Sequence, residues 1–186
     1  MKRALLFMGL LLGFVVPMLA QEHAEVTVFG DYTRIAPLNG NFYGVGARLG
    51  FNTGKFIQFE GEMAYDFTQS YTTTVLDQVT DLPTPAQSSL HLWHGLFGPK
   101  LQTKGPVKAF VFAKGGFINF AGGNPSFTNQ VNSFGSPSTY GVLYPGGGLE
   151  GKLGPIGLRL DVGDEIYFDN GAHNNLKVTF GPTFTF

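Results

Sequence analysis

The sequence predicts an all-β fold, an antiparallel up-and-down barrel of eight strands with an apolar outer face. Apolar and polar residues alternate with a period of two in eight segments, as in strands whose two faces meet different surroundings. The chain is rich in Gly (27) and Phe (19), whereas only 13% of its residues are charged. Glycine suits tight turns and aromatic residues suit a lipid-facing belt, so we expect a transmembrane barrel.

The N-terminal segment has the features of a secretory signal peptide. Lys2 and Arg3 precede an apolar run over 4–16, Pro17 breaks the run, and Ala20 offers a small residue for cleavage. The run is shorter than the ~20 apolar residues that a membrane-spanning helix needs. We therefore expect a signal peptide at 1–20 and a barrel domain at 21–186, which is 186 − 20 = 166 residues. The absence of Cys excludes a lipoprotein anchor and disulfides.

The charge of the mature part excludes one class of partner. Without Lys2 and Arg3 it has 12 − 2 = 10 positive residues against 13 negative ones. A nucleic-acid-binding surface needs a basic field, and none is present. We expect no nucleic-acid partner.

The first four strands are expected at 25–34, 41–51, 55–69 and 89–101. The third alternates most regularly and places Glu60 and Glu62 on one face, which cannot lie in lipid but can lie in a polar interior. Two segments contain exceptions. Phe29 falls on the polar face of the first strand, and three Leu residues fall on the polar face of the fourth: Leu90, Leu92 and Leu96.

The other four strands are expected at 107–119, 140–152, 156–168 and 176–186. In the seventh, Asp164 lies on the apolar face, which is tolerable only at the end of the strand. The connections are short at 52–54, 103–106 and 153–155, and the others are expected at 35–40, 71–88, 120–139 and 169–174. Short turns at one end and longer loops at the other are the layout of outer-membrane barrels, with the turns in the periplasm.

The last strand has apolar side chains at every second position and ends on a Phe. Its expected lipid-facing residues are Leu176, Val178, Phe180, Phe184 and Phe186. This segment resembles the C-terminal signal strand of bacterial outer-membrane β-barrels, and residues 25–186 as a whole resemble the small OmpA-like barrel family.

The resemblance implies an outer-membrane location with both termini on the periplasmic side and membrane lipid as a partner. It also implies recognition of the C-terminal strand by the barrel-assembly machinery, and no cofactor. Many OmpA-like proteins continue into a peptidoglycan-binding domain. None is expected here, since the sequence stops at Phe186.

The polar faces place seven cations and eight carboxylates inside the barrel. An eight-stranded barrel is just wide enough for its side chains to fill it, so these charges must pair. The predicted ion-pair network comprises Arg48, Glu60, Glu62, Lys100, Lys108, Lys114, Glu150, Lys152, Arg159, Asp161 and Glu165; Glu25, Asp31, Asp66 and Lys177 share the polar face. A tight turn at 52–54 would pair Arg48 with Gln58 and make Glu60 its diagonal neighbour.

Catalytic and metal sites have little support in the sequence. Ser89 and His91 share a strand face, as a lipid-modifying enzyme would require, but Glu60 and Glu62 are expected on the opposite face. His91 and His94 have opposite parity and cannot chelate one metal ion without a bulge. We expect no catalytic residues and no metal.

The leading hypothesis is an integral outer-membrane protein with a structural or surface-presenting role and an interior plugged by ion pairs. A small channel is the alternative, because six interior glycines would leave room: Gly44, Gly46, Gly116, Gly146, Gly148 and Gly181. A lipid-acting enzyme is a third possibility. A soluble lipocalin-like barrel is a fourth, and it requires the apolar residues to point inward and the charges outward.

Overall fold

The structure is a computed structural model that describes residues 24–36, 40–76, 83–122 and 138–186. For residues 71–76, 83–88 and 138 it describes the backbone only. The expected signal peptide and most of the expected loop at 120–139 lie outside the described residues.

Ten strands make up the described part of the chain, and all belong to one antiparallel sheet. They are β1 (Ala24–Ile35), β2 (Gly40–Asn52), β3 (Ile57–Leu76), β4 (Pro83–Gln102), β5 (Val107–Gly122), β6 (Ser138–Leu153), β7 (Ile156–Asp164), β8 (Ile166–Phe168), β9 (Ala172–His173) and β10 (Asn175–Thr185).

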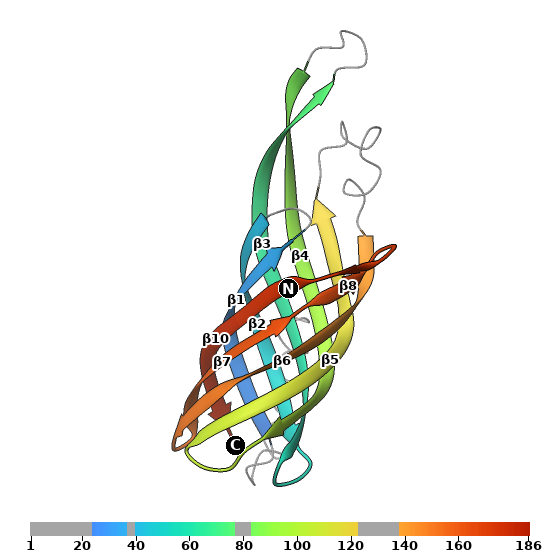
Figure 1. Ribbon diagram of the computed structural model, residues 1–186. Helices are drawn as coiled ribbons and strands as arrows, with labels where there is room; N and C mark the ends of the chain where they lie inside the picture. Colours follow the sequence, from blue (N-terminus) through green and yellow to red (C-terminus); the bar gives the residue numbers. More distant parts are fainter. Residues whose placement is uncertain (1–23, 37–39, 77–82, 123–137) are drawn as a thin grey trace, which may run out of the picture.

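The sheet closes on itself into a barrel of eight long strands (Figure 1). Strands β1 to β7 pair in sequence order, and β10 pairs with both β7 and β1. Strand β8 continues the direction of β7 along β6 and forms a small hairpin with β9. The expected eight-stranded antiparallel barrel is confirmed.

The two ends of the barrel differ. We call the end with the β2–β3, β4–β5 and β6–β7 connections the turn end, and the other the loop end. At the turn end, Gly105 (φ 119°) and Gly154 (φ 66°) occupy the left-handed backbone region that short connections require. The C-terminus lies at this end (Figure 1).

The third and fourth strands are longer than expected. The ladder between β3 and β4 continues to the pair Leu76↔Pro83, with a register shift between Asp66 and Gln69. The expectation of a loop over 71–88 is wrong for the paired residues. The Thr-rich stretch 72–75 has high strand propensity, and a hairpin already paired inside the barrel can extend its ladder outward. This hairpin rises beyond the loop end (Figure 1).

The β2–β3 connection is also wider than expected. Thr53 donates its backbone N–H to the carbonyl of Ile57 at 3.1 Å, and Asn52 pairs with Gln58. The hairpin therefore centres on residue 55 instead of 53. Arg48 consequently lies opposite Glu62, and its predicted pairing with Gln58 is wrong.

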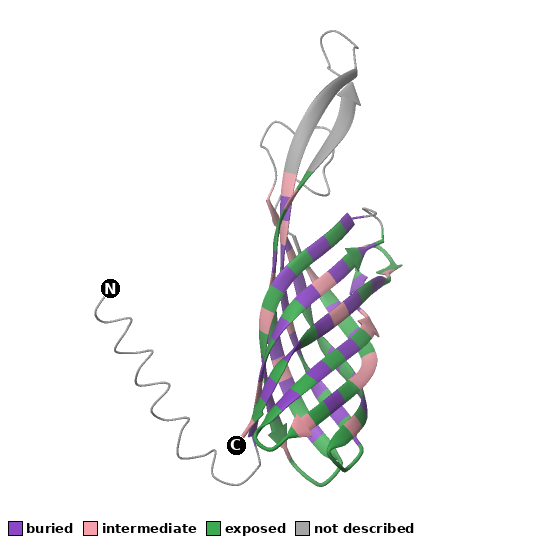
Figure 2. Cartoon of the chain, turned by 90° about the vertical axis from the view of Figure 1, so that its left-hand side faces the viewer, coloured by how far each residue is buried: buried purple, intermediate pink, exposed green. Residues whose placement is uncertain are grey.

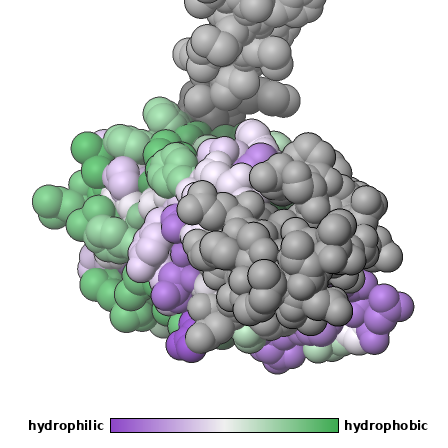
Figure 3. Space-filling model, turned by 90° about the horizontal axis from the view of Figure 1, so that it is seen from above, coloured by the Kyte–Doolittle hydropathy of each residue, from purple (hydrophilic) through white to green (hydrophobic). Residues whose placement is uncertain are grey.

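Most charged residues of the strands point into the barrel, and most large apolar residues point out of it. Arg48, Lys100 and Arg159 are at most 1% exposed, whereas Val111, Leu158 and Phe180 are 56–59% exposed. Buried and exposed residues alternate along much of the long strands (Figure 2). Hydrophobic side chains cover the outer wall at the left of the view from above (Figure 3). This orientation is the reverse of the one that a soluble lipocalin-like barrel requires.

The apolar exceptions of the sequence pattern are interior residues. Leu90, Leu92 and Leu96 are buried and join an apolar cluster in the barrel. Its other members include Ile35 and Phe42, which lie next to the β1–β2 connection. The interior is therefore charged along part of its length and apolar toward the loop end. The described residues include no helix long and apolar enough to cross a membrane.

Candidate functional site

The most distinctive group of side chains is the set of charges in the barrel interior. Ion pairs of 4.0 Å or less divide it into two networks with no ion pair between them among the described residues. The lower network, on the turn-end side, contains six cations and five carboxylates. They are Arg48, Lys100, Lys108, Lys114, Lys152, Arg159, Glu25, Glu60, Glu62, Glu150 and Asp161.

Glu60, on β3, is the centre of the lower network. Its carboxylate accepts two hydrogen bonds from the Arg159 guanidinium, at 2.5 and 3.0 Å, in the bidentate geometry that suits Arg. The ammonium groups of Lys114 and Lys100 lie 2.8 and 3.0 Å away, and Arg48 lies 3.7 Å away. Four cations from four different strands therefore meet at one fully buried carboxylate.

Arg48 connects the same group to two further carboxylates. Its Nε lies 2.6 Å from Glu62 and its Nη2 lies 2.7 Å from Asp161. Lys114 also binds Glu62, at 2.6 Å. Each charge thus has a partner of opposite sign, as burial in a narrow space requires.

Aromatic rings fill the space between the charges. The Arg48 guanidinium lies 4.8 Å from the centre of the Phe29 ring, and the Arg159 guanidinium lies 4.3 Å from that of Phe110. Lys114 makes a similar contact with Phe112 at 4.6 Å. Cation–π contacts of this kind explain why these Phe residues occupy positions on the charged face.

The interior glycines do not leave an open path where aromatic rings approach them. A Cβ atom on Gly46 would lie 2.4 Å from the ring of Phe29, and one on Gly146 would lie 2.5 Å from that of Phe112. A Cβ on Gly148 would lie 2.7 Å from the Phe110 ring. These glycines make room for the rings, which removes much of the reason for expecting a channel.

The second network, on the loop-end side, is centred on His94. This side chain is 1% exposed and its two ring nitrogens lie 2.6 Å from Glu165 and 3.1 Å from Asp66. Lys177 contacts both Asp31 and Glu165. A neutral imidazole has one N–H and an ionised carboxylate only accepts, so two such hydrogen bonds call for the imidazolium form.

This arrangement changes the charge count made from the sequence. With His94 as an imidazolium, the second network has two cations against three carboxylates. Together with the lower network, the interior then holds eight cations and eight carboxylates. His94 and Lys100 are both even-numbered residues of β4 and therefore lie on the same face of the strand. This shared face was the feature of the sequence that could have placed His94 in the interior.

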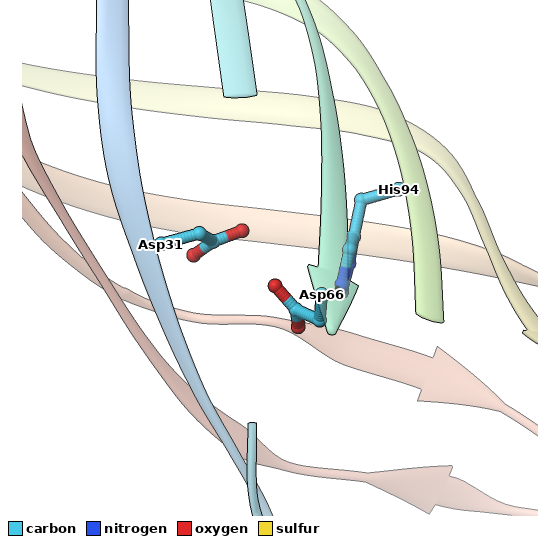
Figure 4. A group of neighbouring side chains, drawn as sticks. All are labelled: Asp31, Asp66 and His94. Carbon is cyan, nitrogen blue, oxygen red and sulfur yellow. Dashed lines mark hydrogen bonds and ion pairs between the residues drawn. The ribbon is translucent and has the colours of Figure 1, made fainter. Parts of the chain in front are cut away.

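Asp31, Asp66 and His94 are also the one group of described residues with the spacing of a possible metal site. One ligand atom from each lies within 4.8 Å of the other two, and the carboxylates of Asp31 and Asp66 point toward each other (Figure 4). However, Lys177 already binds Asp31, and both ring nitrogens of His94 are engaged by carboxylates. A metal ion would have to displace a proton and stand next to an ammonium group, so the group fits an ion-pair cluster better than a metal centre.

The structure places every residue of the predicted network in the interior or at its mouth. Ten of the eleven belong to the lower network, and Glu165 belongs to the second network. Glu25 joins the lower network through Lys152, at 3.0 Å. Of the side chains predicted to face lipid from the last strand, Leu176, Phe180 and Phe184 are exposed on the outside of β10. Val178 is half-buried, and Phe186 directly follows the strand and is exposed.

Ser89 and His91 do not form a catalytic arrangement with the glutamates. His91 lies on the outward side of β4, with its ring 5.6 Å from that of Tyr65. Glu60 and Glu62 are buried on the inside of the barrel. The wall of the sheet therefore separates the histidine from both carboxylates.

Asp164, the charged exception of the seventh strand, lies at the loop end of β7. It is partly exposed and accepts hydrogen bonds from the side-chain amide of Asn174 at 2.5 Å and the backbone N–H of Asn175 at 2.9 Å. Its place at the end of the strand and its polar partners account for its position on the apolar face.

Comparison with known proteins identifies the fold. No family model matches the sequence, and no curated protein matches it. Among solved structures, the N-terminal β-barrel domain of Pseudomonas aeruginosa OprF matches with a TM-score of 0.56 at 13% identity, over 89% of this chain and 98% of that chain. This chain has the fold of the OmpA-like eight-stranded barrels. Neisserial surface protein A shares this OmpA-like fold, with a TM-score of 0.50 at 12% identity over 88% of this chain and 96% of that one.

Proposed function

We propose that this chain is an integral protein of the bacterial outer membrane with a structural or surface-presenting role. The observation that carries the proposal is the reversed distribution of side chains, with buried charges inside a closed barrel and large apolar side chains over its outside. In water such an outer surface would be an apolar patch far larger than soluble monomers carry. In a bilayer it meets hydrocarbon, and closure of the sheet leaves no unpaired strand edge.

The proposal includes the route and the orientation. Residues 1–20 would direct export and be cleaved, leaving residues 21–186 as the barrel domain. Both termini would lie on the periplasmic side together with the turn end, and the long β3–β4 hairpin would project outward. What the outward loops bind is left open.

Strand β10 would carry the signal for the barrel-assembly machinery. It presents Leu176, Phe180 and Phe184 on the outer face, and Phe186, which directly follows the strand, is also exposed. It is also the strand that closes the barrel, because it pairs with β7 on one side and β1 on the other. Recognition of this strand would therefore couple insertion to closure.

The interior supports a plug in preference to a pore. A selective pore would show a ring of charges of one sign, whereas the cations of the lower network lie 2.5–3.9 Å from carboxylates. Toward the loop end, the interior contains a cluster of buried apolar residues that includes Leu92 and Ile118. We expect planar-bilayer recordings on refolded protein to show no conductance; steady single-channel currents would contradict the plug.

A non-enzymatic role without cofactor or metal is part of the proposal. The separation of His91 from Glu60 and Glu62 by the barrel wall supports it. Incubation of refolded protein with lipid A and phospholipid should release no acyl chains. Release that is lost in Ser89→Ala would contradict this part.

Cell fractionation tests the location. The full chain should appear in the outer-membrane fraction, require detergent for extraction, and run on a gel at a different position before and after boiling. Recovery as a detergent-free monomer from the soluble periplasm would overturn the proposal.

A further inference from the structure

A basin opens at the turn end of the barrel. It has a volume of about 860 Å³ and is bordered by the three turns and by Thr185 near the C-terminus. The β2–β3 and β4–β5 turns each contribute a lysine to it, Lys55 and Lys104. Its size falls in the range of small-molecule sites, roughly 300–1,000 Å³.

The basin is lined by lysines of two kinds. Lys108 and Lys152 are 17% and 14% exposed and are anchored from below, since Lys152 lies 3.0 Å from both Glu25 and Glu150. Lys55 and Lys104 are exposed, and Lys104 lies 4.7 Å from the centre of the Phe56 ring. None of the described residues that line the basin is acidic.

The charge below the basin does not neutralise these lysines. The lower network, which includes Lys108 and Lys152, has six cations against five carboxylates, an excess of one positive charge. Lys55 and Lys104 add two more at the rim. The second network, farther along the barrel, has the opposite imbalance, so the positive end of the interior is the end that opens into the basin.

We propose that this turn-end basin binds a ligand that carries phosphate groups. Lysine ammonium groups are compact point charges that bind phosphate, and the described lining residues include four lysines and no acidic side chain that would repel it. The basin has a volume of about 860 Å³ and four lysines in its lining, which suits a ligand with more than one phosphate group. The phosphates could belong to a soluble molecule or to the headgroup of an anionic lipid. This proposal does not depend on the proposed function, because the turns of the folded barrel form the basin whatever the role of the protein.

Inorganic pyrophosphate is the probe for the test. The full barrel, refolded in a maltoside detergent without phosphate buffer, is titrated calorimetrically at low salt. We expect saturable binding that weakens as salt is added, because exposed charges are screened. Lys55→Gln combined with Lys104→Gln should weaken binding about tenfold or more, since it removes the exposed charges without touching the ion-pair networks.

Arg34→Gln is the matched control. Arg34 is exposed at the loop end, so this change removes a positive charge far from the basin and should leave binding unchanged. Native mass spectrometry of protein refolded with phosphatidylglycerol identifies the source of the phosphate. Lipid retained by the parent and lost from the double variant indicates a headgroup, whereas pyrophosphate binding without retained lipid indicates a soluble ligand. The proposal is overturned if neither probe binds, or if the double variant and Arg34→Gln behave alike.

Discussion

Neutralising Glu60 is the sharpest test of the interior network. Glu60→Gln keeps the size and shape of the side chain but removes the negative charge that Arg159, Lys114, Lys100 and Arg48 share at 2.5–3.7 Å. The lower network would change from six cations against five carboxylates to six against four. Loss of one partner from a buried ion pair costs about 3–5 kcal/mol, and Glu60 is fully buried. We therefore expect the free energy of unfolding to fall by about 3–5 kcal/mol.

The measurement is reversible denaturant unfolding in lipid vesicles, followed by the fluorescence of Trp93. This is the only Trp of the chain and lies on the outer face of β4, where lipid would surround it. The change in midpoint at constant slope gives the change in stability.

Arg48→Gln is the matched comparison because it also neutralises one buried charge. It leaves five cations against five carboxylates, and Glu62 and Asp161 keep Lys114 and Arg159 as partners. Its cost should be smaller than that of Glu60→Gln, and the double variant should be less stable than Arg48→Gln alone. The excess of cations in the lower network should make loss of a carboxylate more costly than loss of a cation. A Glu60→Gln variant as stable as the parent, or one more stable than Arg48→Gln, would refute this reasoning.

Three further predictions concern other parts of the barrel. His94→Ala should lower the unfolding free energy by several kcal/mol, since it leaves Asp66 and Glu165 without their shared cation; a change below about 1 kcal/mol would mean that the histidine is not an imidazolium. Gly46→Ala should lower the unfolding free energy by about 1–3 kcal/mol, because the new methyl group would meet the Phe29 ring at 2.4 Å. Gly141→Ala should leave the unfolding free energy unchanged, because no atom lies within 4 Å of the new methyl group. In vesicles, Val111→Arg on the outer face should lower the unfolding free energy by about 2–4 kcal/mol, and Leu153→Arg at the turn end should lower it by at most about 1 kcal/mol. Equal losses for the two variants would contradict the membrane position.

The faces of the strands could be predicted from the sequence. The side of a strand on which a residue lies depends only on whether its number is odd or even, which is a local property of extended backbone. For this reason the pattern alone placed Arg48, Glu60 and Arg159 in the interior and Phe180 outside. Even the exceptions, Phe29 and the three Leu residues of β4, lie on the face that their parity predicts.

The register between strands was decided by the tertiary structure. The predicted partner of Arg48 was Gln58 and the observed one is Glu62. The two differ by four positions, and an even shift leaves every side chain on the same face, so the hydrophobic pattern cannot distinguish them. The register depends on the width of the turn, and here Thr53 bonds to Ile57 across a wider turn than the Asn52-Thr53-Gly54 sequence suggests.

Closure of the barrel decided which charges meet. His94 and Glu165 are 71 positions apart, and Lys177 and Asp31 are 146 positions apart, yet each pair is in contact. The alternation of the sequence predicts that these groups point inward. Which of them become partners depends on the order in which the closed sheet brings the strands around the interior, and on the depth at which each register places them. The division into two networks of opposite imbalance is therefore a property of the folded barrel alone.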